Sequence, residues 1–468
     1  KPVVAGNRDG SVDALDNGRL SILVDPPNAA ELEKNLVGLI EGNHPHPLAQ
    51  NPEALCAAVS AQFGFQRVSG LMVSSLRPWV FGEQPATDEP PLADSAASSP
   101  GASPAFRVVV VTEFPSPYQI ELFNAIALSG SCLLEVVYMS DHDTTRHWQR
   151  PSIAHVNWIV SEGKSIQWEA RKSIQDADLV VFNTYLFRFS LRALWLRAGL
   201  GKPWVFWGER PGSLQTGSLG RLMRNVLLRP LHQCSAPIWG MGKFGVEGYQ
   251  REYGPDRTYR NFAYASDLER FYSLAERPAT MRVFVYSGSL TRRKGCDLLA
   301  TAFASVAARF PQARLVIVGR GPLEIEMRQT LSNCATQVDW LGFQSWEDIP
   351  AAMKLGSVLC LPSRYDGWGL ALIEGLAAGM PGIGTDQTGS ALELIADNKA
   401  GWLVPAGDAA ALENAMEQAL RLDDAAFASM QKAARNAAST YGLDVAAPRF
   451  LELCREALSN WHCIKTEI

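Results

Sequence analysis

From residue 106 onwards, short segments rich in valine and isoleucine alternate with longer segments that have helical periodicity. One such series begins with the apolar segment 106–112 and a second with 283–287. Strands that alternate with helices pack into parallel sheets covered by helices on both faces. The sequence therefore predicts an α/β fold with two doubly wound, Rossmann-like domains in tandem, whose strand ends face an interdomain cleft.

The same patterns give approximate bounds for the elements. In the first series we expect strands at 106–112, 133–139, 178–183 and 203–207, with a helix at 119–129. In the second we expect strands at 283–287, 315–318, 338–341 and 358–361, with helices at 296–309, 323–331, 349–354 and 370–378. A last helix is expected at 441–458.

Composition excludes several classes of protein. The chain has 43 Lys and Arg against 48 Asp and Glu, a net charge of −5, which argues against a globally basic nucleic-acid binder. Its eight cysteines form no C-x-x-C pair and no zinc-ligand cluster, and such scattering in a large chain is typical of reduced, cytoplasmic proteins. No apolar run approaches the roughly 18 residues that a membrane span needs. We therefore expect no metal site, no nucleic-acid partner and a cytoplasmic location.

A glycine-bounded basic loop follows the strand expected at 283–287. It reads from Gly288 to Gly295 and contains Arg293 and Lys294. Glycine lets the backbone approach a phosphate, and the two cations neutralise the phosphate charge. We favour a phosphate-binding loop over the alternative, a solvated basic turn.

A pair of acids frames the start of the helix expected at 370–378. Asp366 and Glu374 are eight residues apart, and Gly367, Gly369 and Leu370 lie between them. The free amides at such a helix start favour anions. Glu374 could accept hydrogen bonds from ribose hydroxyls and Asp366 from sugar hydroxyls. The structural alternative makes Asp366 only a helix cap.

These motifs, in this order, resemble glycosyltransferase family 4, the glycosyl transferases group 1 family with the GT-B fold. The Glu-x7-Glu signature of that family appears here as Asp366-x7-Glu374, one methylene shorter at the first acid. The Arg-Lys-Gly of the family matches Arg293 to Gly295. Its base-pocket turns match Gly319 and Gly321, and the segment 340–344 with Phe343.

The resemblance implies a retaining, metal-independent glycosyltransferase that uses a UDP-sugar or a GDP-sugar as donor. Its acceptor would be a glycan, a lipid-linked sugar or another molecule in polysaccharide or glycoconjugate biosynthesis. Arg293, Lys294 and the helix amides would stabilise the departing diphosphate in place of a divalent cation. Two alternatives remain open: a nucleotide-sugar-binding scaffold without turnover, and a sugar-nucleotide epimerase of the same fold.

The first Rossmann-like domain is expected to supply the acceptor side. Tyr118 and Gln119 lie in its first strand-end loop, at a helix start. Glu209 and Arg210 follow the strand expected at 203–207, where the family places a polar residue near the transferred sugar. We therefore expect Asp366, Glu209 and Arg210 to form the catalytic group, while the alternative for Arg210 is a structural pair with Glu209.

The domain organisation follows from these assignments. Residues 2–36 match 381–416 at nine collinear positions, so 1–83 are predicted to be the partial C-terminal domain of a preceding transferase. The predicted order is the partial domain 1–83, a flexible Pro/Ala/Ser-rich linker at 84–105, an acceptor domain at 106–278, a nucleotide-sugar domain at 279–445, and a helix at 446–468 that packs back on the acceptor domain.

The segment 106–275 carries a net positive charge. Within it, residues 217–232 read as a helix with arginines among leucines. Such a helix is either an ordinary amphipathic surface helix or a contact with an anionic membrane surface. The second alternative would make the protein peripheral at the inner face of the membrane.

Overall fold

The computed structural model describes residues 4–6, 22–24, 106–142, 150–211, 225–274, 278, 280, 282–396 and 399–461. The chain divides into two compact units, Lys1–Ser99 and Pro100–Ile468. The predicted linker 84–105 lies outside the described residues.

In the N-terminal unit, β1 (Val4–Gly6) pairs with β2 (Ile22–Val24) in parallel, with Val4 opposite Ile22. The repeat seen in the sequence equates these strands with residues of β14 and β15, where Ile383 lies opposite Trp402. The two strand pairs therefore share the same direction and the same register. Most of the segment 1–83 lies outside the described residues, so its assignment as a partial domain stays a prediction.

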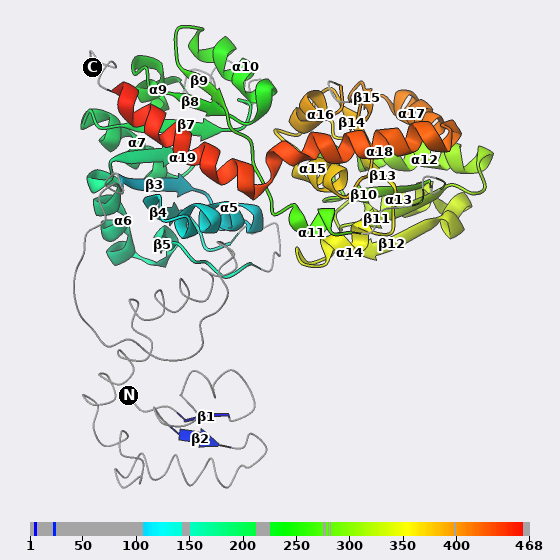
Figure 1. Ribbon diagram of the computed structural model, residues 1–468, viewed down its shortest axis with the longest axis horizontal. Coiled ribbons are helices and arrows are strands. Elements are labelled where there is room, and N and C mark those ends of the chain that lie inside the picture. Colours follow the sequence, from blue (N-terminus) through cyan, green and yellow to red (C-terminus); the bar gives the residue numbers. More distant parts are fainter. Residues whose placement is uncertain are drawn as a thin grey trace, which may run out of the picture. The chain divides into compact units, whose positions relative to one another are not determined.

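The second unit contains two parallel sheets (Figure 1). The first has the order β5-β4-β3-β6-β7-β8-β9. Its strands are β3 (Phe106–Thr112), β4 (Cys132–Tyr138), β5 (Val156–Ile159), β6 (Leu179–Phe182), β7 (Trp204–Gly208), β8 (Ile238–Gly240) and β9 (Tyr259–Asn261). The strand order reverses between β3 and β6, and ligands of such folds bind beside that switch point.

The second sheet has the order β12-β11-β10-β13-β14-β15. Its strands are β10 (Val283–Ser287), β11 (Arg314–Val318), β12 (Val338–Gly342), β13 (Val358–Leu361), β14 (Gly382–Thr385) and β15 (Gly401–Val404). Its switch point lies between β10 and β13. The prediction of two doubly wound, Rossmann-like domains is confirmed.

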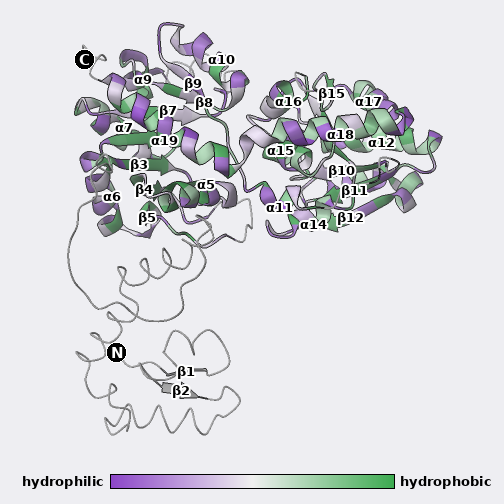
Figure 2. Ribbon diagram, in the orientation of Figure 1, coloured by the Kyte–Doolittle hydropathy of each residue, from purple (hydrophilic) through white to green (hydrophobic). Residues whose placement is uncertain are grey.

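Helices cover the faces of each sheet. The first domain uses α5 (Pro117–Leu128), α6 (Lys164–Asp176), α7 (Arg188–Gly199), α9 (Arg229–Gln233) and α10 (Gly242–Tyr253), and α11 (Glu269–Tyr272) leads to the second. The second domain uses α12 (Cys296–Arg309), α13 (Glu324–Thr330), α14 (Ile349–Met353), α15 (Leu370–Ala377), α16 (Gly389–Leu394), α17 (Ala409–Arg421) and α18 (Asp424–Ala438). Apolar colour gathers on the strands and polar colour on the outer helices (Figure 2).

The last helix, α19 (Leu443–Asn460), returns from the second domain to the first and packs against α5 (Figure 1). Its residues Ala446, Phe450, Leu453 and Cys454 share one apolar core with Val108 and other residues of the first sheet. The final helix of the chain is therefore part of the interior of the first domain.

In the segment 217–232, residues 217–224 lie outside the described part, residues 225–227 are helical, and the short helix α9 lies at the end. No helix among the described residues is long and apolar enough to cross a bilayer.

Candidate functional site

The basic loop and the Asp366 loop follow β10 and β13, which are neighbours in the second sheet. Because both strands end at the same edge, their loops lie against each other. The Arg364 backbone N–H donates to the Arg293 carbonyl at 2.9 Å, and Arg293 Nη1 donates to the Tyr365 carbonyl at 3.1 Å. The structure thus brings the two motifs together at the switch point.

Asp366 lies beside both cations of the basic loop. Its carboxylate forms an ion pair with Lys294, and its Oδ1 lies 3.8 Å from Arg293 Nη1. Only 8% of Asp366 is exposed, whereas the Arg293 side chain is 45% exposed. An anion that enters here would meet the accessible Arg293 guanidinium and would compete with Asp366 for Arg293 and Lys294.

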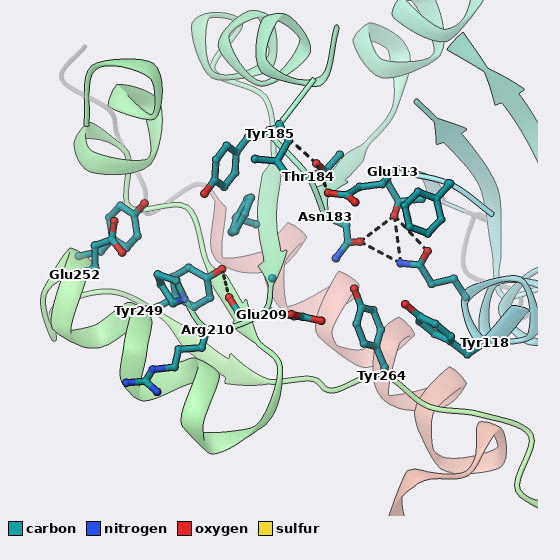
Figure 3. Close-up of a pocket in the computed structure, with 18 residues that line it drawn as sticks. Glu113, Tyr118, Asn183, Thr184, Tyr185, Glu209, Arg210, Tyr249, Glu252 and Tyr264 are labelled. Atoms are coloured by element: carbon teal, nitrogen blue, oxygen red, sulfur yellow. Dashed lines mark hydrogen bonds between the residues drawn. The ribbon is translucent and has the colours of Figure 1, made fainter. Parts of the chain in front are cut away.

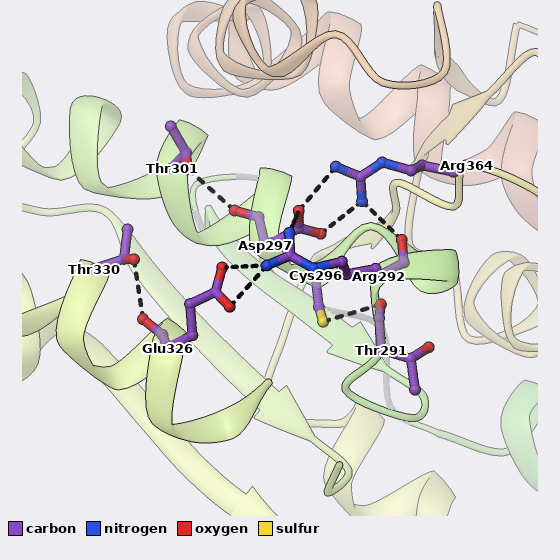
Figure 4. A network of polar contacts seen from close by, with 8 residues as sticks. All are labelled: Thr291, Arg292, Cys296, Asp297, Thr301, Glu326, Thr330 and Arg364. Atoms are coloured by element: carbon purple, nitrogen blue, oxygen red, sulfur yellow. Dashed lines mark hydrogen bonds and ion pairs between the residues drawn. The ribbon is translucent and has the colours of Figure 1, made fainter. Parts of the chain in front are cut away.

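A second polar network holds the base of the basic loop (Figure 4). Arg364 Nη1 and Nη2 donate to the two Asp297 carboxylate oxygens at 2.7 and 2.8 Å, and Nη1 also donates to the Arg292 carbonyl at 2.7 Å. Burial acts to raise the pKa of Asp297, but hydrogen bonds and charge from Arg364 outweigh it and lower that pKa. Arg292 pairs with Glu326 on α13 at 3.0 Å. Arg292 and Arg364 therefore hold the loop in place through these contacts.

Close backbone approaches explain the glycines at this edge. A Cβ on Gly295, whose φ is 67°, would lie 1.9 Å from the Pro362 carbonyl oxygen. A Cβ on Gly319, whose φ is 137°, would lie 1.9 Å from the Gly288 carbonyl oxygen, and one on Gly321 would lie 2.5 Å from a backbone oxygen. No side chain fits at these positions, so the turns after β10, β11 and β13 touch through their backbones.

The start of α15 lies next to the first domain. Gly369, with φ 90°, is the cap residue, and Leu370 is the first helical residue. A Cβ on Gly367 would lie 2.1 Å from Glu209 Oε2, so the Glu209 carboxylate packs against this backbone. Predicted site residues of the two domains therefore meet here. Phe343, expected to face the base, follows β12 and is 43% exposed.

Glu374 lies in different surroundings from Asp366. It is 9% exposed, and its carboxylate lies near Ser266 and Arg270. Burial raises the pKa of Glu374 to about 7, partly offset by Arg270. Glu121 of α5 lies 3.7 Å from Arg270 Nη2, and burial raises its pKa to about 7 as well. Two acids from different domains thus share one guanidinium.

The first domain holds a pocket of about 310 Å³ at its own switch point (Figure 3). The loops after β3, β6 and β7 form its floor, and α10 and Tyr264 form its walls. Its lining residues include Glu113, Tyr118, Gln119, Asn183, Thr184, Tyr185, Phe206, Glu209, Arg210, Tyr249, Glu252, Tyr253 and Tyr264.

A neutral hydrogen-bond network fixes the pocket floor (Figure 3). Asn183 Oδ1 accepts from Thr112 Oγ1 at 2.9 Å and from Gln119 Nε2 at 3.1 Å. Asn183 Nδ2 donates to the Trp207 carbonyl at 2.9 Å. Tyr118 makes an edge-on ring contact with Tyr264 at 4.9 Å between centroids. The amides of this floor are therefore held in place by the strands themselves.

Arg210 points along the wall of the pocket. Its guanidinium stacks on the Phe244 ring at 3.8 Å from the centroid, and Nη1 donates to Gln387 Oε1 at 3.4 Å. The Arg210 carbonyl accepts from the Tyr365 hydroxyl at 3.0 Å. Arg210 therefore contacts the second domain through both its side chain and its backbone.

Several residues of this region carry no sequence signal that a single chain reveals. Tyr249, Glu252 and Tyr264 come from segments without a motif, and Arg270 and Glu121 lie near the domain crossing. Arg364 lies two residues before Asp366 of the predicted acid pair, and only this position suggests a role. Across the described residues, no group of three His, Cys, Asp or Glu side chains is placed to hold a metal ion.

The two facing Rossmann-like domains define the GT-B fold. Sucrose-phosphate synthase from Thermosynechococcus elongatus superposes with a TM-score of 0.59 at 20% identity, over 76% of this chain and 99% of that chain. The Anabaena protein Alr3699/HepE, solved in complex with UDP, gives a TM-score of 0.60 at 15% identity, over 75% of this chain and all of that chain. Both likenesses concern the fold.

The sequence comparisons concern the second domain. The family model "Glycosyl transferases group 1" matches residues 275–439. A GDP-mannose-dependent alpha-(1-6)-phosphatidylinositol monomannoside mannosyltransferase from Mycobacterium tuberculosis is 34% identical over 158 residues. The alignment covers 32% of this chain and 40% of that relative, so the chain spans less than half of its length.

Proposed function

We propose that the protein is a glycosyltransferase that moves a sugar from a nucleotide-sugar donor to a hydroxyl group of a glycan or lipid-linked acceptor in polysaccharide or glycoconjugate biosynthesis. One observation carries the proposal: the Glu209 carboxylate lines the first domain's pocket and packs against Gly367 of the signature in the second. An acceptor in the pocket and a donor at the basic loop would meet at this point.

The second domain supplies the donor side of the proposal. Arg293 and Lys294 would bind the diphosphate, and the amides at Gly369 and Leu370 would add hydrogen bonds. Gly288, Gly319, Gly321 and Phe343 would surround the nucleoside. The diphosphate would displace Asp366 from Lys294, which frees the Asp366 carboxylate to accept hydrogen bonds from the sugar.

The transfer step is a substitution at the anomeric carbon. The acceptor oxygen bonds to this carbon, the bond from the carbon to the diphosphate oxygen breaks, and the acceptor proton leaves with the nucleoside diphosphate. Arg293 and Lys294 stabilise the negative charge that develops on the leaving group, which is the part of the barrier that fixed charges lower most. We propose retention of anomeric configuration and no metal requirement, in line with the resemblance.

We also propose a cytoplasmic location. The six cysteines that the structure describes are free and buried, as in reduced compartments. Peripheral contact with an anionic membrane is part of this proposal, because α7 exposes Arg188, Arg192 and Trp195 on one side. Trp195 Nε1 bonds to the carbonyl of Leu227, which is also exposed. Cations and apolar groups together are the features that bind such a surface.

Incubation of the full chain with UDP-sugars and GDP-sugars, with and without sugar acceptors, tests the function. A transferase releases nucleoside diphosphate and adds sugar to an acceptor. Isomerised sugar nucleotide without acceptor would establish the epimerase alternative, and tight nucleotide binding without any product would establish the scaffold. Lys294→Ala is the matched variant, because loss of product in it ties turnover to the basic loop.

A further inference from the structure

Arg364 connects the basic loop to the acid pair through both its backbone and its side chain. Its backbone N–H donates to the Arg293 carbonyl at 2.9 Å, and its Nη1 donates to the Arg292 carbonyl at 2.7 Å (Figure 4). Two consecutive peptide groups of the basic loop are therefore bonded to one residue of the loop after β13. Asp366 follows two positions later, so the place of Arg364 also bears on how its carboxylate meets Lys294.

Asp297, in the first turn of α12, holds the Arg364 guanidinium in place. Nη1 and Nη2 of Arg364 donate to the two carboxylate oxygens at 2.7 and 2.8 Å, the two-pronged geometry that makes arginine ion pairs strong. The Asp297 side chain is 13% exposed and that of Arg364 is 36% exposed, so solvent screens this pair less than a fully exposed one. The pair ties the loop after β13 to the helix that follows the basic loop.

The turn that carries the two phosphate-binding cations is short. It is a single 3-10 turn over Arg292–Lys294, closed by bonds from the Lys294 N–H to the Thr291 carbonyl at 3.0 Å and from the Gly295 N–H to the Arg292 carbonyl at 3.1 Å. Such turns have poor hydrogen-bond geometry of their own. The Arg292 carbonyl thus accepts one bond from within the turn and a second from Arg364, which fixes the turn from outside.

A guanidinium at this place has two conceivable roles. Arg364 could bind the diphosphate directly, or it could hold Arg293 and Lys294 in position for it. The contacts favour the second role, because both terminal nitrogens are bonded to Asp297 and Nη1 is also bonded to the backbone. A phosphate on Arg364 would have to break these bonds and weaken the pairing of a largely buried carboxylate, which is costly.

We propose that Arg364 and Asp297 are positioning residues for the diphosphate: their ion pair fixes the turn that carries Arg293 and Lys294, and neither residue contacts the donor itself. This inference rests on the proposed function, since it concerns the same diphosphate-binding loop. Fixed charges stabilise a leaving group only when they are held in place beforehand, and a displacement of about 1 Å can cost roughly a hundredfold in rate. The pair should therefore determine diphosphate affinity and leave nucleoside affinity unchanged.

Binding of UDP and GDP to the full chain, compared with uridine and guanosine, tests the proposal by calorimetry and saturation-transfer NMR. Arg364→Met and Asp297→Asn should each weaken diphosphate binding about tenfold and lower kcat of donor hydrolysis, with nucleoside affinity unchanged. A direct contact predicts opposite signs, because Asp297→Asn would free the guanidinium and strengthen diphosphate binding. Unchanged or stronger diphosphate binding in Asp297→Asn would overturn the proposal, as would an equal loss of nucleoside affinity.

Two further variants give the test a matched control and a conservative exchange. Arg309→Met removes an arginine of similar exposure from the same helix, where Arg309 pairs with Glu413 and Glu417 of α17, and it should keep wild-type diphosphate affinity. An equal loss in Arg309→Met and Arg364→Met would show that ion pairs of α12 support only the fold. Arg364→Lys should recover part of the affinity, because an ammonium group cannot reproduce the two-pronged contact. Full recovery would remove that geometry from the proposal.

Donor hydrolysis by the wild type separates this inference from the function itself. A wild-type chain that releases nucleotide from a sugar donor, with Arg364→Met and Asp297→Asn equally active and equally tight for UDP and GDP, would refute only the positioning role. A wild-type chain that releases no nucleotide from any sugar donor would refute the function.

Discussion

The switch points of the two sheets are built alike in backbone and differently in charge. The second gathers Arg293, Lys294 and Arg364 around Asp366 and Asp297, so its loops are held by ion pairs. The first is held by neutral amide and hydroxyl bonds centred on Asn183. A site held by ion pairs can exchange an internal carboxylate for a ligand phosphate, whereas a neutral network keeps its shape when a ligand binds.

The largest effect expected from this comparison follows from Lys294→Ala. The variant removes one charged hydrogen bond to the diphosphate, which contributes about 1.5–3 kcal/mol, and we expect kcat/KM to fall by roughly 100-fold. The rate of donor hydrolysis measures the fall in kcat/KM, and nucleotide binding measures the lost hydrogen bond to the diphosphate. Lys354→Ala, an exposed lysine that follows α14 and precedes β13, is the control. Equal activity in both variants would mean that the ion pairs serve only the fold.

The contact of Glu121 and Glu374 with Arg270, between the two domains, should make the free energy of unfolding depend on pH. The folded-state pKa values of Glu121 and Glu374 are raised to about 7 from 4.5, so the folded protein binds more protons than the unfolded chain between these values. The contribution of each acid to stability is fully present below about pH 4.5 and is lost as the pH rises through about 7, by roughly 3 kcal/mol for each acid taken alone.

Denaturant unfolding of the wild type and of Glu121→Gln across this pH range measures the loss. The glutamine variant should show a flatter pH dependence, because its side chain does not titrate. Parallel curves for the two proteins would show that Glu121 carries no raised pKa.

The neutral network should respond differently. Asn183→Ala removes the acceptor of Thr112 and Gln119 and the donor to Trp207, which should lower the free energy of unfolding by about 1–2 kcal/mol. Because no ion pair is involved, the loss should not depend on salt. Acceptor KM should rise while nucleotide affinity stays constant. If nucleotide affinity fell by the same factor as acceptor KM rose, the two switch points would not have the separate roles proposed for them.

The smallest effect is expected from removal of residues 1–99. They form a compact unit separate from Pro100–Ile468, and the motifs all lie in the latter. The truncated chain should keep donor hydrolysis and sugar transfer, with a melting temperature within about 1 °C of the full chain. An inactive or clearly less stable fragment would show that the N-terminal unit supports the remainder.

The sequence predicted the second domain better than the first, for physical reasons. Helix α12 has the predicted bounds, because Gly295 precedes it and its apolar residues recur with helical periodicity. In the first domain, β8 and β9 are three residues long, too short for periodicity to show. The pocket walls escaped prediction because Tyr249 and Tyr264 become neighbours of Gln119 only through tertiary packing. Likewise, no local pattern shows that Arg364 pairs with Asp297.

The return of α19 to the first domain has a consequence for synthesis on the ribosome. Phe450, Leu453 and Cys454 complete the core around Val108 and Val136, yet they are translated after the whole second domain. Until then the nascent first domain exposes the apolar surface between α5 and its sheet, which is the kind of surface that chaperones bind. The first Rossmann-like domain therefore completes its folding last. A stop codon shortly before Leu443 should leave a chain that aggregates, although all strands of both sheets are encoded before it.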